Sequence, residues 1–156
     1  MSTLTDAIRA DLTAAMKARD EDVKRTLRSL LAAIQNEAVS GAKHEVGDED
    51  VLRLIAREIK KRRESASIYR EAGRTELADA EETEADILAR YQPAQLDDAD
   101  LAAVVDKVVA EVAQETGAPV TMKQMGQVMK VAQAATAGRA DGKRISAAVR
   151  ERLQRA

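Results

Sequence analysis

The sequence predicts an all-α protein, and three observations support that prediction. Its 156 residues include only two prolines and seven glycines, so few positions interrupt a helix. Aromatic residues make up 1% of the chain, and alanine, leucine, valine, glutamate and arginine dominate. Apolar residues recur at steps of three and four along most of the chain. We therefore expect helices around an aliphatic core, with a four-helix amino-terminal domain and a small three-helix tail domain.

The first two helices are expected over residues 3–19 and 22–39, packed antiparallel because their connection is short. Thr3 is the predicted N-cap of the first, and Ser40-Gly41 closes the second. A third helix begins at Asp48, whose charge suits a helix amino terminus, and continues to Glu71. The residues predicted to face inward are Leu4, Ile8, Leu12, Ala15 and Met16, then Val23, Leu27, Leu30, Leu31, Ile34 and Ala38, then Val51, Leu54, Ile55 and Ile59.

Opposite charges are concentrated on the third and fourth helices. Arg62 projects towards the apolar stripe of the third helix, so it needs a carboxylate partner or a route to solvent. We expect the two helices to pair antiparallel and neutralise each other along their edges. A metal site is the weaker interpretation, because Glu81, Glu82 and Glu84 do not share a helical face. The cations are Arg53, Arg57, Lys60, Lys61 and Arg63, the carboxylates include Glu76, Asp79 and Asp86, and the fourth helix is anchored by Leu77, Ile87, Leu88 and Tyr91.

A domain boundary is expected after the fourth helix, because Pro93 disfavours a helical conformation in the residue before it. The predicted domains are residues 1–92 and 97–156. A fifth helix begins at Asp97–Asp100 and ends at Gly117, with its apolar stripe at Leu101, Val104, Val105, Val108 and Val112. The last two helices are joined by a turn at residues 137–143, where Gly138 suits a left-handed helix end and Asp141 suits an N-cap.

The outer faces of these last two helices predict a cationic surface that can lie along a phosphate backbone. Thr121 is the expected N-cap of the first of them, and Met122, Met125, Val128, Met129 and Ala132 form its apolar stripe. Opposite that stripe lie Lys123, Gln127 and Lys130, and the next helix presents Lys143, Arg150 and Gln154, with Arg139 and Arg144 at the turn. The alternative interpretation is an ordinary solvated helix face.

Composition excludes several kinds of site. There is no cysteine, which rules out disulfides and thiolate chemistry, and the one histidine, His44, lies in a predicted loop over residues 40–47. No nucleotide-binding or nucleophile motif is present. The turn at Gly138–Lys143 could offer backbone N–H groups to a phosphate, but we expect it to be a structural turn. We expect no catalytic residue, metal or cofactor. Without a run of about 18 apolar residues or a secretory pattern, we expect a cytoplasmic protein that does not bind membranes.

The net charge of −2 means that any affinity for nucleic acid must come from local patches. Tyr69 and Tyr91 are the only aromatic residues, so binding of single strands by base stacking is disfavoured. Recognition of RNA by shape and backbone is expected instead. The helix–turn–helix pattern also allows duplex DNA, with Lys143 to Arg155 as the recognition helix.

Several segments together resemble the GatB/YqeY family, specifically its short stand-alone YqeY-like proteins. They are Ala72-Gly73-Arg74-Thr75-Glu76-Leu77, then Glu81-Glu82-x-Glu84-x-x-Ile87-Leu88-x-x-Tyr91-x-Pro93-x-Gln95-Leu96, then Gly126-x-Val128-Met129-Lys130, and Gly138-Arg139-Ala140-Asp141-Gly142-Lys143. The resemblance implies an all-helical fold with a tail similar to that of the B subunit of the glutamine-dependent aspartyl/glutamyl-tRNA amidotransferase. That tail is associated with holding tRNA, which by resemblance maps onto Lys123, Lys130, Arg139, Lys143 and Arg144.

The chain has no counterpart of the large cradle domain in which the amidotransferase activates its substrate. A carbon–nitrogen ligase activity with glutamine as amide donor is therefore not expected of this chain alone. The expected function is a tRNA-binding module, with tRNA or a tRNA-charging or amidation complex as partner. The alternatives are a helical protein–protein adaptor that does not bind RNA and an accessory part of an amidation enzyme.

Overall fold

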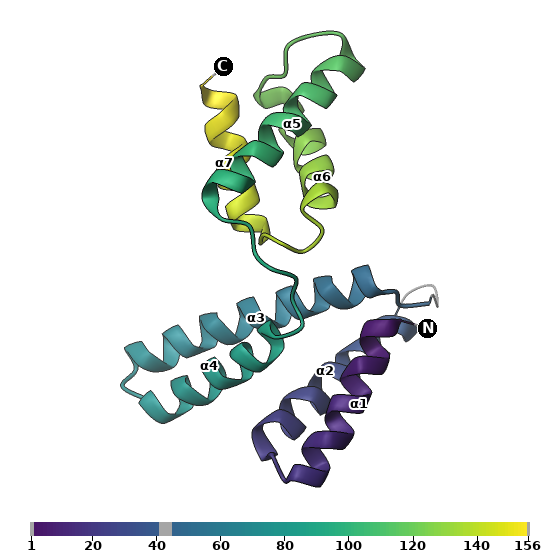
Figure 1. Ribbon diagram of the computed structural model, residues 1–156. Helices are drawn as coiled ribbons and strands as arrows, with labels where there is room; N and C mark the ends of the chain where they lie inside the picture. Colours follow the sequence, from purple (N-terminus) through teal and green to yellow (C-terminus); the bar gives the residue numbers. More distant parts are fainter. Residues whose placement is uncertain (1, 41–44, 156) are drawn as a thin grey trace. The chain divides into compact units, whose positions relative to one another are not determined.

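The computed structural model describes residues 2–40 and 45–155, and it confirms the all-α prediction (Figure 1). Those residues form seven α-helices and one short 3-10 helix, and none of them forms a strand. In the same two ranges, no helix has the length and apolar character needed to cross a bilayer. His44, predicted to be in a loop, lies outside the described residues.

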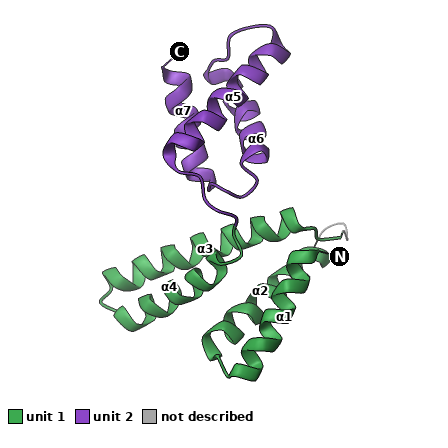
Figure 2. Cartoon of the chain, viewed as in Figure 1, with its two compact units in different colours: residues 1–92 green, residues 93–156 purple. Residues whose placement is uncertain are grey.

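The contacts between Cα atoms divide the chain into two compact units, residues 1–92 and 93–156 (Figure 2). Four of the α-helices belong to the first unit and three to the second. Residues 93–96, predicted to link the two domains, make their contacts with the second unit. That each unit folds by itself remains a prediction.

Unit 1 consists of two helical hairpins (Figure 1). Its helices are α1 (Thr3–Ala18), α2 (Glu21–Val39), α3 (Asp48–Glu71) and α4 (Thr75–Ala89). Helix α1 packs on α2, α3 packs on α4, and α2 also contacts both α3 and α4. The core between them is aliphatic: Ile8, Leu27, Leu30, Ile34, Val46, Val51, Leu54, Ile55, Ile59, Ala85, Ile87 and Leu88. The predicted inward positions therefore hold for most of unit 1.

Two residues predicted to face the core are exposed instead. Met16, in the last turn of α1, is 49% exposed, and Leu77, in the first turn of α4, is 42% exposed. Helical periodicity assigns a side chain to a face, but it does not say whether a neighbouring helix extends far enough to cover a terminal turn. The prediction was wrong at these helix ends for that reason.

The N-cap of α1 is Ser2 rather than the predicted Thr3. The Ser2 hydroxyl accepts a hydrogen bond from the Thr5 N–H at 3.1 Å and donates to the carboxylate of Asp48. The same carboxylate accepts from the Thr3 hydroxyl at 2.7 Å and from the Leu4 N–H at 3.0 Å. Asp48, the first residue of α3, thus ties the start of α1 to the start of α3.

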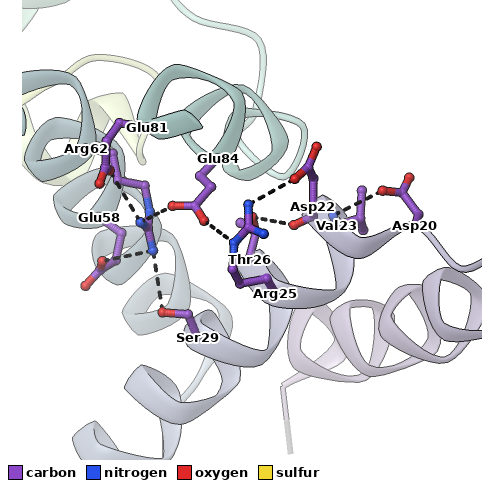
Figure 3. A network of polar contacts seen from close by, with 10 residues as sticks. All are labelled: Asp20, Asp22, Val23, Arg25, Thr26, Ser29, Glu58, Arg62, Glu81 and Glu84. Atoms are coloured by element: carbon purple, nitrogen blue, oxygen red, sulfur yellow. Dashed lines mark hydrogen bonds and ion pairs between the residues drawn. The ribbon is translucent and has the colours of Figure 1, made fainter. Parts of the chain in front are cut away.

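A single carboxylate joins three helices of unit 1 (Figure 3). Glu84 on α4 accepts from the Arg62 Nη1 of α3 at 2.6 Å and from the Arg25 Nε of α2 at 2.8 Å. Glu81 and Glu58 also lie within 4 Å of the Arg62 guanidinium, and the Ser29 hydroxyl accepts from its Nη2 at 3.4 Å. Of the two outcomes predicted for Arg62, a carboxylate partner or a route to solvent, the structure shows the carboxylate partner.

Further ion pairs run along the edge between α3 and α4. Arg63 contacts Glu82 at 2.5 Å and Asp86 at 3.2 Å, and Arg70 contacts Asp79 at 3.5 Å. These contacts confirm that the two helices form a mutually neutralising pair.

Unit 2 contains α5 (Asp98–Thr116), the 3-10 helix η1 (Met122–Gln124), α6 (Met125–Thr136) and α7 (Gly142–Gln154). Helices α5, α6 and α7 all contact one another. Their shared core is again aliphatic: Leu101, Val105, Val108, Val109, Val112, Val120, Val128, Ala132, Ile145, Val149 and Leu153. As predicted, Gly117 ends α5 in the left-handed conformation, and the Asp141 carboxylate caps α7 by accepting from the Arg144 N–H at 2.7 Å.

The sixth helix departs from the prediction at both ends. Thr121 caps a 3-10 turn, and the α-helix begins only at Met125. Because of that different start, Met122 lies outside the apolar stripe and is 45% exposed. At the other end Ala137 is left-handed, with φ 48°, and so is the predicted Gly138, with φ 80°. Two successive left-handed residues reverse the chain within a short turn.

We predict that Glu84→Ala lowers the free energy of unfolding by about 2 kcal/mol, because it leaves two arginines without their shared partner. Glu84 and Arg62 are only 13% and 15% exposed. Urea unfolding followed by circular dichroism measures the change. The control is Asp79→Ala, whose pair with Arg70 is more than half exposed and should contribute less than about 1 kcal/mol. Equal losses in the two variants would contradict a special role for Glu84.

We predict that the free energy of unfolding falls at acidic pH, in part because the Asp48 carboxylate becomes protonated. Its hydrogen bonds from Ser2, Thr3 and Leu4, in that order, lower its pKa from 3.8 to about 2. A carboxylate with a lowered pKa stabilises the fold above pH 4, and this contribution disappears as the pH falls towards 2. Asp48→Asn should therefore be less stable than wild type at pH 6, with a smaller difference at pH 2.

Thermal unfolding between pH 2 and pH 7 tests the Asp48 prediction. Glu49→Gln is the matched control, since the exposed Glu49 side chain has no hydrogen bond within the described residues. A constant difference between Asp48→Asn and wild type across this range would contradict the assigned origin of the effect.

The two units should each remain helical when they are produced as separate fragments, residues 1–92 and 93–156, because each has its own aliphatic core. Circular dichroism of each fragment, compared with the intact chain, measures this. Loss of helix in both fragments would show that the two cores depend on each other.

Candidate functional site

The charges of unit 2 are separated along its sequence. Residues 121–155, which contain η1, α6 and α7, carry eight lysines and arginines against two aspartates and glutamates. Residues 93–120, which contain α5, carry one cation against six carboxylates. Helices α6 and α7 therefore present a positive region on neighbouring elements, although the whole molecule is slightly acidic.

Four of the six predicted site residues are exposed cations without a neutralising partner. Lys123 lies on η1, Lys130 on α6, and Lys143 and Arg150 on α7. None of the four side chains makes an ion pair or hydrogen bond to any residue that the structure describes. Lys130 lies opposite the buried Val128 and Ala132, and Lys143 and Arg150 lie on the side of α7 opposite the buried Ile145. These four cations are available to an external anion.

Lys123 does not share a helical face with Lys130 in the way that the sequence predicted. The expected spacing of i, i+4 and i+7 requires one continuous α-helix through both residues. The 3-10 turn at Met122–Gln124 has a different number of residues per turn, so the two faces do not continue into each other. Lys123 remains exposed, but it belongs to η1 rather than to the outer face of α6.

Arg139 is half-buried, and its guanidinium lies at the end of α6. Its Nε donates to the carbonyl of Thr136 at 3.0 Å, and its Nη2 donates to the carbonyl of Ala135 at 3.2 Å. The last carbonyls of a helix have no partner within the helix and carry partial negative charge. Arg139 therefore stabilises the carboxyl end of α6 while its own charge is not cancelled by a carboxylate.

Arg144 fixes the segment that leads into α5. Its Nη2 donates to the carbonyl of Leu96 at 2.8 Å and to the Asp98 carboxylate at 3.0 Å. The Leu96 N–H donates in turn to the carbonyl of Arg139 at 2.8 Å, and the Gln95 side chain donates to the carbonyl of Gly138 at 3.2 Å. The turn at residues 137–143 is thus held to residues 95–98.

Some amide groups in this turn and directly after it have partners within the chain. The N–H of Arg139 donates to Thr136, the N–H of Arg144 to the Asp141 carboxylate, and the N–H of Ile145 to the Asp141 carbonyl. Amides used in this way are not free to surround a phosphate. The turn therefore serves as a helix junction that carries cationic side chains.

One exposed cation of this region was not predicted. Arg155 follows the last turn of α7, and its side chain has no partner within the described part of the chain. The excess of cations after residue 120 was the signal that could have identified it. Arg152, by contrast, is used internally, because its Nε contacts the Asp106 carboxylate of α5 at 2.8 Å.

Two further polar groupings of unit 1, one around Asp48 and one around Tyr91, serve structural roles. A hollow of about 340 Å³ is lined by Ser2, Thr3 and Asp48, which already form the cap of α1. The Tyr91 hydroxyl donates to the Asp11 carboxylate at 2.5 Å, and partial burial, followed by this contact, raises the pKa of the Tyr91 phenol. Within residues 2–40 and 45–155, no group of three acidic, histidine or cysteine side chains is placed to hold a metal ion.

Known proteins resemble the chain over most of its length. The family described as Yqey-like protein matches residues 5–153. An uncharacterized protein of Schizosaccharomyces pombe, C22F3.15, is 37% identical over 90 residues, which is 58% of this chain and 72% of the relative.

Two fungal relatives carry the name "Altered inheritance of mitochondria protein 41, mitochondrial". The one from Clavispora lusitaniae is 28% identical over 88 residues, which is 56% of this chain and 51% of the relative. The one from Meyerozyma guilliermondii is 34% identical over 87 residues, which is 55% of this chain and 44% of the relative. The matched region thus spans about half the length of these two proteins. Since the family match extends over nearly the whole sequence, the chain belongs to the YqeY-like family.

Proposed function

We propose that this chain is a tRNA-binding accessory module, whose unit 2 contacts the phosphate backbone through η1, α6 and α7. The observation that supports this most is the set of exposed, unneutralised cations Lys123, Lys130, Lys143 and Arg150. Each can release a counterion when it meets a phosphate, and this release drives the binding of proteins to nucleic acids. The resemblance of the tail to that of the amidotransferase B subunit makes tRNA the expected RNA.

The chemistry of this surface favours recognition of the backbone over recognition of bases. Unit 2 has no aromatic residue on which a base could stack. Lysines are point charges on flexible stems and predominate among the four cations, whereas bidentate reading of a base requires the planar fork of arginine or an amide. The module should therefore bind folded RNA with little preference for sequence.

In this role the chain catalyses no step itself. It acts as an accessory part of a tRNA-charging or amidation complex. Its RNA contact depends on exposed charge and not on the compartment in which the protein works. A cytoplasmic location remains a prediction.

A protein–protein adaptor is the second candidate function. It is favoured by two exposed apolar side chains of unit 1, Ile68 near the end of α3 and Leu77 at the start of α4, which are 66% and 42% exposed. Exposed apolar side chains that lie together can form a surface that binds another protein.

The triple variant Lys123→Gln, Lys130→Gln and Lys143→Gln should bind tRNA on the order of ten-fold more weakly at 50 mM salt. The slope of log K against log salt should become shallower by about 2, because each lost phosphate contact removes a counterion-release contribution. Filter binding of tRNA at several salt concentrations measures both quantities.

The matched control removes the same charge from unit 1, with Lys17→Gln, Arg28→Gln and Arg74→Gln. These three side chains are exposed and have no partner among the described residues. The control should bind tRNA within about two-fold of wild type, since it keeps the whole proposed surface. If both triple variants lose affinity equally, the affinity depends on the total charge of the protein and not on the surface of unit 2. If neither differs from wild type, the adaptor becomes the better interpretation.

A further inference from the structure

Helix α3 has a second group of cations, which the ion pairs of unit 1 leave unused. Seven lysines and arginines lie on α3. Four of them have carboxylate partners: Arg53 contacts Asp50, Arg62 contacts Glu84, Arg63 contacts Glu82 and Arg70 contacts Asp79. The other three, Arg57, Lys60 and Lys61, are exposed and have no ion pair or hydrogen bond to the described residues.

These three residues, which we name the α3 cation face, lie together on the outer side of the helix. At 100° per residue they span about 100° of arc and about 6 Å along the axis. The opposite side of α3 carries Val51, Ile55 and Ile59, which are buried in the unit 1 core. The α3 cation face is therefore fixed in direction, because the helix cannot rotate without exposing that core.

The arrangement of carboxylates keeps this face positive. Five of the six acidic residues of α4, all except Glu76, contact Arg62, Arg63 or Arg70, and so they are held away from the outer side of α3. Glu64 is the nearest exposed carboxylate one turn later in the sequence, and its single charge does not cancel three cations. Like the cations of unit 2, this group is positive within a molecule of net charge −2.

The chemistry of the face favours a nucleic-acid backbone over other partners. A membrane-surface helix needs an apolar side free to enter the lipid, and the apolar side of α3 is already buried. A protein partner usually needs aromatic or aliphatic anchors, with lysine depleted at the centre of the contact. The positions at the centre of this face are instead two lysines and an arginine, and these suit contacts with successive phosphates.

We propose that the α3 cation face is a second RNA-contacting surface, located on unit 1, which binds phosphates through Arg57, Lys60 and Lys61. This second proposal rests on the proposed function, because the RNA that contacts the α3 cation face is the tRNA that unit 2 binds. The face adds backbone contacts without reading bases. It also gives the amino-terminal unit a role in binding.

The test uses the full chain and a triple variant, Arg57→Gln, Lys60→Gln and Lys61→Gln. Glutamine is a good helix former, and the substituted side chains are exposed, so α3 should remain intact. Affinity for tRNA at 50 mM salt should fall on the order of ten-fold, and the salt slope should become shallower by about 2. The control is Lys17→Gln with Arg28→Gln and Arg74→Gln, which removes the same charge from other helices and should stay within about two-fold of wild type.

A measurement on the wild-type chain makes the test independent of any change in folding. Ultraviolet crosslinking to tRNA, followed by mass spectrometry, should give crosslinked peptides that include residues 57–61. The absence of crosslinks in this segment, with crosslinks present in residues 121–155, would overturn the proposal.

The unit 2 variant separates this proposal from the proposed function. If the α3 variant binds as wild type does while the unit 2 variant is weakened, the α3 proposal is overturned and the proposed function stands. If only the α3 variant is weakened, the α3 proposal stands and unit 2 is the wrong site. If wild type binds no tRNA, both are overturned. A last control measures whether the protein sediments with vesicles that contain anionic lipid. If the α3 variant loses this sedimentation while its tRNA binding is unchanged, the partner is a membrane and the α3 proposal is overturned.

Discussion

The contact on which the rest of unit 1 depends is the carboxylate of Glu84, shared between Arg62 of α3 and Arg25 of α2. Burying the guanidinium of Arg62 would be unfavourable without carboxylate partners, because an unpaired charge loses its hydration and gains nothing in return, and Glu84 is the nearest of these partners. With it, a polar network holds the α3–α4 hairpin against α2 beside the aliphatic core. The helices can therefore pack in one register, since any slip separates the charges.

This use of carboxylates also decides which cations remain available. Along α3, Arg62, Arg63 and Arg70 pair with carboxylates of α4, and the exposed Arg53 pairs within its own helix, while the unpartnered cations face outward. In unit 2 the same division occurs between helices, because α5 holds most of the acidic residues while α6 and α7 hold most of the basic ones. A chain with almost balanced total charge can thus present local positive surfaces, and a calculation of net charge alone would miss them.

The helices and most of the core followed from apolar periodicity and from capping residues such as Asp141, because both signals depend on residues close in the sequence. The exposure of Met16 and Leu77 did not follow, since it depends on how far a neighbouring helix extends. The candidate surface was predicted as exposed lysines and arginines, but the internal contacts of Arg139 and Arg144 depend on which carbonyl groups the fold brings near them. Sequence patterns identify charge better than they identify its partners.

Arg139 illustrates a difference between two kinds of surface cation. Carbonyl oxygens, which carry no net charge, hold its guanidinium at the end of α6, so the residue keeps its full positive charge in a fixed position. A lysine on an outer face must instead lose rotamer freedom when an anion binds, at a cost of about 1 kcal/mol. The turn between α6 and α7 therefore carries one cation in a fixed orientation beside the more flexible lysines, so the electrostatic potential of this region is partly set by the fold itself.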